Sequence, residues 1–361
     1  MKTLVISMHP APYRDPVFVA LKNKTDVDFL DLYETDRGHT EWGYEHAKKT
    51  VKFRRIPFLG DFHFGLRKIV KEYDTVLIPG WFPIGLLDLL IFCVKQHKKV
   101  VFSCDTVSCS NNLFHKYIFK YLKKCNSFFV PGNRAALFLE NQVGIEPKKI
   151  FRGSYMIDES DWNNKVNKWR NNRQDNRESL KISETDFILL FVGKFVKNRD
   201  IPLLVNSIKL AREKNKNIRC IIIGTGEFYK DSILDCLKYD SNAIIHYEKV
   251  QYEELAKFYS IADCYIHPGD EPYSLATVQA VTAGLPIISH KNVGCLSDYV
   301  VDDDNGLIIQ EKDCRKFSDA IINIYENKDK FSNNAISACK YYLQERNVDY
   351  AVKQLIDALT H

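Results

Sequence analysis

The chain has 361 residues, of which 45% are hydrophobic, 27% are charged and 12% are aromatic. This length exceeds what one compact core usually holds and suits two domains. The composition excludes a disordered, collagen-like or disulfide-scaffold protein. The net charge of +5 is too small to indicate a nucleic-acid-binding protein, but it is unevenly distributed. Residues 1–154 hold 24 basic and 15 acidic side chains, and the remaining 207 residues hold 27 and 31.

Apolar stretches of strand length alternate with amphipathic helical stretches through the first part of the chain. The expected strands are residues 4–8, 27–32, 75–79, 100–103 and 127–131, and the expected helices are residues 15–22, 85–96 and 113–124. Such alternation predicts a parallel sheet that helices cover on both faces. We therefore expect an N-terminal Rossmann-like domain over residues 1–155.

A change in composition follows this domain. Residues 158–181 are polar and rich in Asn, Arg and Asp, which indicates a linker or a surface helix. We assign a linker region to residues 156–181. The alternation of strands and helices then restarts, which predicts a second Rossmann-like domain over residues 182–340. The sequence favours one long amphipathic helix at the end of the chain, and we expect residues 341–361 to pack back on the first domain. The predicted fold class is α/β, with two doubly wound domains facing a cleft in which ligands bind at the carboxyl ends of the strands.

The ten cysteines and the apolar stretches bear on the compartment. None of the cysteines form a CxxC pair and most lie in apolar segments, which favours buried thiols in a reducing cytoplasm. The N-terminal apolar run is too short for a signal peptide, and the longest apolar stretch, residues 84–94, contains Asp88 and is too short to span a bilayer. We expect a cytoplasmic protein, and peripheral contact with the inner face of a membrane stays open.

Two glycine-containing turns follow predicted strands of the second domain. In the first, Lys194 and Arg199 flank a turn between Gly193 and a helix that begins near Pro202, a favourable position for proline. The glycine permits close backbone approach, and the two cations can clamp a diphosphate; a solvated basic turn is the alternative. In the second, Gly224 belongs to a Gly-x-Gly sequence, which is a weak phosphate-binding signal and equally typical of an ordinary tight turn.

The longest ordered pattern is residues 267–286. A strand leads into an acidic loop with Glu271, Ser274 suits a helix N-cap, and Gly284 suits the end of that helix. The first amides of the helix and its dipole favour an anion, and Glu271 can accept hydrogen bonds from sugar hydroxyls beside a bound phosphate. The alternative is that Glu271 is a solvated loop acid and Gln279 a surface amide.

These motifs together resemble those of the family-4 retaining glycosyltransferases of the GT-B fold. That family's signature is a Glu, seven residues, a second Glu and then a small residue followed by Gly-Leu-Pro. Here Glu271 is followed by seven residues, Gln279, and then Ala283-Gly284-Leu285-Pro286. The resemblance covers residues 185–310 strongly. It covers residues 1–154 by architecture and by the loop at residues 9–16.

The resemblance implies a reaction. A hexose-type sugar would move, with retention of configuration, from a nucleoside diphosphate sugar to a hydroxyl of a glycan or lipid-linked acceptor, in cell-surface polysaccharide biosynthesis. No metal and no other cofactor is expected, because cationic side chains and helix amides would stabilise the leaving diphosphate.

The resemblance also implies roles for individual residues. Lys194 and Arg199 would bind the diphosphate, Glu271 would hold the donor sugar, and Gln279 would face the ribose. Glu271, Lys194, Arg199 and Asp105 are the catalytic candidates. The other expected donor-binding residues are Gly193, Gly224, Val250, Tyr273, Ser274, Leu275 and Ala276.

Two departures from the family pattern leave alternatives open. Gln279 replaces the usual second Glu and loses charge-assisted pairing of about 1 kcal/mol, so a non-catalytic nucleotide-sugar binder is one alternative. A GT-B nucleotide-sugar epimerase is another. Asp105 follows Cys104 where many relatives have a His before the acid. Asp105 could orient the acceptor or the transferred sugar, or could simply cap a helix before Thr106.

The acceptor would bind to the first domain. His9, Tyr13, Arg14 and Trp81 lie on loops after predicted strands. Aromatic faces stack on sugars and Arg14 can bind an acceptor anion, whereas loop packing is the alternative for each residue. The basic excess of this domain fits anionic lipid or a polyprenyl diphosphate, and equally an ordinary solvated surface.

Overall fold

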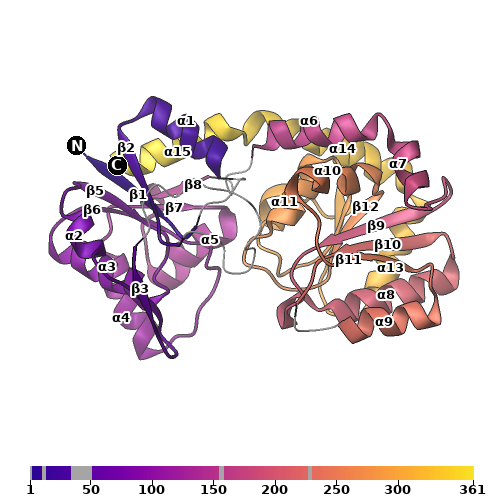
Figure 1. The fold of residues 1–361 in the computed structure, drawn as a ribbon, viewed down its shortest axis with the longest axis horizontal. Helices are drawn as coiled ribbons and strands as arrows, with labels where there is room; N and C mark the ends of the chain where they lie inside the picture. Colours follow the sequence, from indigo (N-terminus) through magenta and orange to yellow (C-terminus); the bar gives the residue numbers. More distant parts are fainter. Residues whose placement is uncertain (1, 10–13, 34–50, 154–157, 227–229) are drawn as a thin grey trace. The chain divides into compact units, whose positions relative to one another are not determined.

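The computed structural model describes residues 2–9, 14–33, 51–153, 158–226 and 230–361 (Figure 1). The chain divides into two compact units. Unit 1 comprises Met1–Asp158 together with Arg346–His361, and unit 2 comprises Glu159–Glu345. Among the described residues, no helix is both long enough and apolar enough to cross a membrane.

Unit 1 is built on the predicted parallel sheet, which has six strands in the order β2-β1-β5-β6-β7-β8. The strands are β1 (Thr3–Ser7), β2 (Val27–Asp31), β5 (Thr75–Ile78), β6 (Lys99–Ser103), β7 (Ser127–Val130) and β8 (Ile150–Arg152). Every pairing within this sheet is parallel. Strand β8 was not predicted, because three residues are too few to show a pattern.

Helices cover both faces of this sheet, as the alternation predicted. Side chains alternate between the faces along a strand, so Leu4 and Ile6 join one apolar cluster while Val5 joins the other. On the first face lie α2 (Leu66–Val70), α3 (Ile84–Lys95), α4 (Leu113–Leu122) and α5 (Asn133–Phe138). On the second face α1 (Asp15–Lys24) lies beside the last helix of the chain (Figure 1).

Unit 1 also contains an antiparallel hairpin that the sequence analysis did not predict. Its strands β3 (Phe53–Ile56) and β4 (Gly60–His63) pair outside the main sheet, and β4 packs on α3. Arg54 and Arg55 interrupt the apolar alternation that would have marked a strand.

The end of the chain returns to unit 1, as expected, but it is not one long helix. Helix α14 (Lys328–Glu345) ends, and α15 (Val348–Thr360) begins after two intervening residues. The side chain of Asn347 accepts a hydrogen bond from the amide of Tyr350, which caps α15 and explains the break. Helix α15 then packs on α1, β7 and β8, and the Ser127 hydroxyl donates to the carbonyl of Ala358 at 2.6 Å.

Unit 2 contains the second predicted parallel sheet, in the order β11-β10-β9-β12-β13-β14. The strands are β9 (Phe187–Val192), β10 (Ile218–Ile223), β11 (Ile244–Tyr247), β12 (Cys264–His267), β13 (Ile287–His290) and β14 (Gly306–Ile309). The helices between and after them are α8 (Ile201–Lys214), α9 (Lys230–Tyr239), α10 (Tyr252–Ile261), α11 (Leu275–Thr282), α12 (Leu296–Tyr299) and α13 (Cys314–Glu326).

The segment predicted as a linker differs in the structure. It forms α6 (Glu159–Arg170) and α7 (Arg173–Ser179), which belong to unit 2 and pack on α10. Trp162 is only 2% exposed, and its indole N–H donates to the carbonyl of Gln279 at 2.9 Å. The polar composition fits the surface-helix alternative, because a helix needs only a few apolar side chains on one stripe, here Trp162 and Val166.

Candidate functional site

The acidic loop of unit 2 runs from the end of β12 to the start of α11. The Ser274 side chain accepts a hydrogen bond from the amide of Thr277, which confirms the predicted N-cap. Gly284 follows the helix with a φ of +74°, as its predicted place at the helix end requires. At Gly294 a Cβ atom would lie 1.6 Å from the carbonyl oxygen of Pro272, so only glycine fits against this loop.

Glu271 is held from two sides. Arg199 donates to Oε1, and Nε2 of His267 lies 3.0 Å from Oε2. Burial raises the pKa of Glu271, but the hydrogen bond and charge of His267 and the charge of Arg199 outweigh it, so the pKa lies below its usual value. Glu271 is therefore a fixed carboxylate, and the alternative of a solvated loop acid is wrong.

Arg199 also fastens the turn after β9 to the loop after β12. Its guanidinium donates to the carbonyl of Asp270 at 2.6 Å, and the Asn198 side chain donates to the same carbonyl at 3.1 Å. Strands β9 and β12 are neighbours in the sheet, so their carboxyl ends meet. Lys194 lies exposed on the same turn as Arg199. The structure thus brings Arg199 and Glu271 together, 72 positions apart in the sequence.

The Gly-x-Gly turn lies beside the turn that follows β9 and begins at Gly193. A Cβ atom at Gly224 would lie 1.9 Å from the carbonyl oxygen of Gly193, so the two glycines permit a contact between backbones. The amide of Gly224 donates to the carbonyl of Tyr247 at the end of β11. Val250, the predicted base contact, is half-buried just before α10.

Gln279 lies in the second turn of α11 and is only 3% exposed. The alternative of a surface amide is therefore wrong. Tyr273 and Ser274 are buried, and Leu275 and Ala276, at the start of α11, are half-buried. The roles predicted for these residues toward a nucleotide sugar stay predictions.

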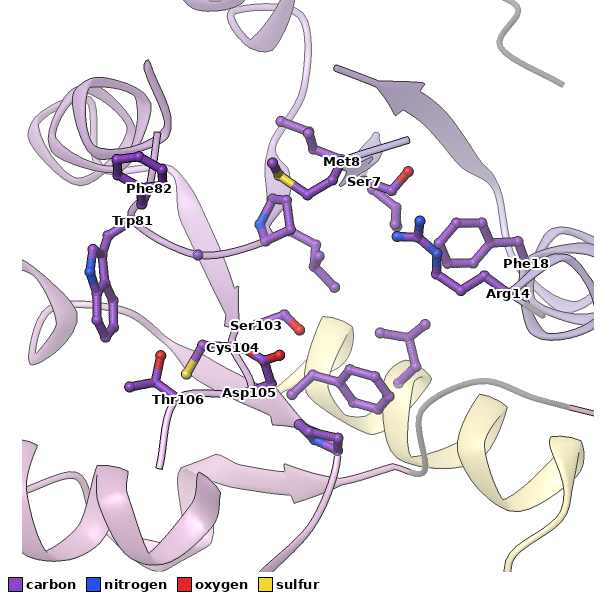
Figure 2. A pocket seen from close by; sticks show the side chains of 18 residues that line it. Ser7, Met8, Arg14, Phe18, Trp81, Phe82, Ser103, Cys104, Asp105 and Thr106 are labelled. Atoms are coloured by element: carbon purple, nitrogen blue, oxygen red, sulfur yellow. The ribbon is translucent and has the colours of Figure 1, made fainter. Parts of the chain in front are cut away.

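A cavity of about 370 Å³ lies in unit 1 at the carboxyl ends of its strands (Figure 2). Arg14, Trp81 and Asp105, three residues predicted from the sequence, line it together. His9 lies next to the cavity, because Arg14 donates to its carbonyl oxygen. Tyr13 lies outside the described residues.

The walls of the cavity combine aromatic and polar side chains. Figure 2 shows Trp81 and Phe82 on one side, Arg14 and Phe18 on another, and Asp105 with Ser103 and Thr106 on a third. The indole of Trp81 stacks on Phe102 with ring centroids 5.9 Å apart, which fixes its orientation. Such a mixture of aromatic faces and a few polar groups is typical of a small-molecule site.

Asp105 does not cap a helix. It lies in a segment without regular secondary structure, and the next helix, α4, begins at Leu113 with Asn112 as its N-cap. The helix-cap alternative is therefore wrong, and Asp105 lines the cavity instead.

Sequence reasoning missed several residues of both sites. In unit 1 these include Ser103, Thr106 and Phe18, and in unit 2 the principal one is His267. Ser103 and His267 end strands, and that position was the signal available for them. Within the described ranges of the chain, no three His, Cys, Asp or Glu side chains gather in a way suited to a metal ion.

Comparison with known proteins identifies the larger part of unit 2. Residues 172–340 match the family model described as "Glycosyl transferases group 1". Unit 2 is therefore similar to group 1 glycosyltransferase domains over most of its length. The resemblance to glycosyltransferases noted in the sequence is confirmed at this level.

Individual relatives extend the similarity to the rest of the chain. The lipopolysaccharide 1,2-N-acetylglucosaminetransferase of Salmonella typhimurium is 30% identical over 166 residues, which are 43% of this chain and 42% of that protein. The alpha-monoglucosyldiacylglycerol synthase of Acholeplasma laidlawii is 24% identical over 356 residues, or 89% of this chain and 84% of that enzyme.

Solved structures establish the fold of the whole chain. Anabaena Alr3699/HepE in complex with UDP superposes with a TM-score of 0.77 at 14% identity and covers 100% of both chains. The same protein in complex with UDP-glucose gives a TM-score of 0.75, covering 100% of this chain and 99% of that one. WaaG, a glycosyltransferase involved in lipopolysaccharide biosynthesis, gives 0.69 at 13% identity and covers 99% of both chains. The predicted GT-B fold class is thereby confirmed.

Proposed function

We propose that the protein is a retaining glycosyltransferase that moves a hexose-type sugar from a nucleoside diphosphate sugar to a hydroxyl of a glycan or lipid-linked acceptor. The observation that carries this proposal is the clamped Glu271 beside Arg199 and the capped start of α11, inside a segment similar to group 1 glycosyltransferase domains. The complexes of HepE with UDP and UDP-glucose support a nucleotide-sugar donor.

At the donor end, the difficult charge develops on the leaving diphosphate. Lys194, Arg199 and the first amides of α11 would stabilise it through fixed charges and dipoles, so the proposal needs no metal ion. Glu271 would accept hydrogen bonds from the donor sugar, Gln279 would bind the ribose, and Val250 would contact the base.

At the acceptor end, the cavity of unit 1 would hold the acceptor glycan. Trp81 offers an aromatic face for a sugar ring, Asp105 an acceptor for its hydroxyls, and Arg14 a cation for an anionic group. The acceptor hydroxyl would attack the anomeric carbon on the face that the diphosphate leaves. The bond from that carbon to the diphosphate oxygen breaks, the new glycosidic bond forms, and the hydroxyl proton passes to the diphosphate.

The names of the relatives suggest the biological setting. The Salmonella enzyme is a lipopolysaccharide glycosyltransferase, and a Staphylococcus aureus relative, 24% identical over 235 residues, is named for capsular polysaccharide biosynthesis. We therefore propose a role in cell-surface polysaccharide biosynthesis on the cytoplasmic side of the membrane.

Helix α4 of unit 1 supports contact with an anionic membrane. Its outer surface exposes Leu113 (85%), Phe114 (50%) and Tyr117 (47%), and the helix has no acidic residue. Four lysines lie exposed on the helix or just after it: Lys116, Lys120, Lys123 and Lys124. Exposed aromatic and cationic side chains on one helix favour an anionic bilayer surface.

Liposome sedimentation tests the membrane contact. We expect binding to vesicles of anionic phospholipid at low salt, weaker binding at high salt, and loss of binding in Lys116→Glu/Lys120→Glu. The matched control is Lys209→Glu/Lys214→Glu on α8 of unit 2. The membrane proposal is wrong if the wild type does not sediment at low salt.

Thermal-shift screening against UDP-, GDP- and ADP-sugars tests the donor, because a ligand that binds the native state raises its melting temperature. We expect one nucleotide series to stabilise the protein, and a new glycosidic product to form once an acceptor is supplied. No stabilisation by any of the three series would contradict the proposal. Binding without transfer or hydrolysis would instead favour a non-catalytic binder, the alternative that Gln279 suggests.

A further inference from the structure

We propose that His267 is a positioning residue that orients Glu271 toward the donor sugar. The inference rests on the proposed function, in which Glu271 binds sugar hydroxyls. It adds a residue to which the sequence pattern gave no role at this site.

The surroundings of His267 leave its imidazole one polar contact. The side chain ends β12, is 1% exposed, and places Nε2 at 3.0 Å from Oε2 of Glu271. Its other ring nitrogen, Nδ1, is buried and has no hydrogen-bond partner among the described residues. The ring lies against Phe191, with centroids 5.9 Å apart. The hydrogen-bonding capacity that His267 uses in this structure is therefore directed at Glu271.

The burial of this imidazole carries a cost that a purely structural side chain would avoid. A buried polar atom without a partner is unfavourable relative to its hydrated state. An apolar residue would fill the same place beside Phe191 without that cost. The hydrogen bond to Glu271 is the contact that an apolar residue could not make.

The two donors fix the carboxylate without saturating it. Arg199 donates to Oε1 and His267 contacts Oε2, so the carboxylate cannot rotate without losing one of these hydrogen bonds. The Ser274 side chain also hydrogen-bonds to Glu271. A carboxylate has about four acceptor positions, so about one stays available for a ligand. A carboxylate oriented in advance loses less conformational entropy when a sugar binds.

The neighbouring carboxylate provides a matched control. Asp270 is also held by a histidine and a cation, because Nδ1 of His290 lies 2.9 Å from Oδ1 and Nζ of Lys312 lies 2.9 Å from Oδ2. His290 is buried as well, with its side chain 5% exposed. Replacing the imidazole of His290 therefore disturbs the same loop, but it leaves the His267–Glu271 contact in place.

The test compares the affinities for UDP-glucose and for UDP, measured by titration calorimetry, since only UDP-glucose carries the sugar that Glu271 would bind. We expect His267→Phe to weaken UDP-glucose about tenfold relative to UDP, because a hydrogen bond to a charged group is lost. His267→Gln, whose amide can donate in place of Nε2–H, should recover most of the lost affinity for UDP-glucose. His290→Phe should leave the ratio of the UDP-glucose and UDP affinities unchanged. His267→Leu serves the same purpose if His267→Phe does not fold.

Two results overturn the proposal: an unchanged ratio of UDP-glucose to UDP affinity in His267→Phe, or the same change of that ratio in His290→Phe.

A second measurement does not depend on the donor. In ¹⁵N-histidine spectra of the full chain we expect a slowly exchanging Nε2–H signal that His267→Gln removes and Glu271→Ala makes fast-exchanging. If the wild type binds neither UDP nor UDP-glucose, the proposed function fails for uridine nucleotides. The spectra then test the positioning role by themselves. A proton on Nδ1 with none on Nε2, or a fast-exchanging Nε2–H signal, contradicts it.

Discussion

At the scale of single residues, Arg199 makes more contacts than a diphosphate clamp requires. It binds the carboxylate of Glu271 and the backbone of Asp270, so it holds the acidic loop even without a ligand. Lys194, on the same turn, is exposed. The two cations therefore differ in what their removal would disturb.

We expect Lys194→Ala to lower kcat/KM for transfer about 10²- to 10³-fold, the usual loss when one fixed donor to a developing charge is removed. Arg199→Ala should cost more, because Glu271 also loses its partner. Steady-state kinetics with circular dichroism as a fold control checks both. Lys197→Ala, an exposed cation in the same turn, is the matched control and should stay near the wild-type rate. Near-normal activity in both Lys194→Ala and Arg199→Ala would contradict the assignment.

Gln279 permits a second residue-scale test. We expect Gln279→Glu to tighten donor binding about fivefold, because a carboxylate pairs more strongly than an amide with a ribose diol. The same change should lower the melting temperature of the free protein, since the site is 3% exposed and a buried charge without a partner is costly. Calorimetric titration and thermal melts measure the two effects. Unchanged donor affinity would place the ribose elsewhere.

At the scale of elements, Asp263 connects four parts of unit 2. Its carboxylate lies at the start of β12 and is 2% exposed. It pairs with Arg173 and Arg177 of α7 and with Lys328 of α14, and it accepts the amide of Ile188 in β9 at 2.8 Å. Burial raises the pKa of Asp263, but the three cations outweigh burial and hold that pKa below its usual value.

The sign of the pH effect follows from the lowered pKa. Asp263 stabilises the fold at pH values above its unfolded pKa of 3.8, and this stability is lost as the pH falls through the lower folded value. We expect Asp263→Asn to cost about 3–5 kcal/mol at neutral pH, because it leaves the buried Arg177 without this carboxylate. Urea unfolding at a series of pH values measures the free energy of unfolding of both proteins. The difference between the wild type and Asp263→Asn should become smaller below about pH 4. A difference that is constant down to pH 2, or one equally present in the exposed control Asp319→Asn, would contradict this account.

The elements that the sequence predicted are those whose pattern is local. Strands buried on both faces appear as apolar runs, so the central strands of both sheets could be predicted. The hairpin β3–β4 could not be predicted, because charged residues interrupt its apolar pattern. For α6 and α7 the polar composition left a linker and a surface helix as alternatives. The site residues were predictable individually, since Arg14, Trp81 and Asp105 each follow a strand. The clamp on Glu271 was not, because it depends on which strands become neighbours in the sheet.

At the scale of the whole molecule, unit 1 is assembled from two segments of the chain. Helix α15 covers one face of its sheet, where Leu355 is fully buried and also lines the cavity. The packing of that helix therefore bears on both the stability of unit 1 and the shape of its cavity.

We expect calorimetry to resolve separate unfolding transitions for the two units, and Leu355→Ala to lower only the transition of unit 1. Loss of a buried leucine costs about 2–5 kcal/mol. Lys353→Ala, on the exposed side of the same helix, should move neither transition. A shift of the unit 2 transition in Leu355→Ala would show that the units do not unfold independently.

The return of α15 has a consequence for synthesis on the ribosome. Domains of a nascent chain generally fold in the order in which they emerge. Here residues 2–158 emerge first, but Ala351, Val352 and Leu355, which complete their core, are translated after all of unit 2. Unit 2 is continuous in the chain and can finish folding first. The unit that is begun first is therefore finished last. One face of its sheet is covered only in part, by α1, until translation reaches α15.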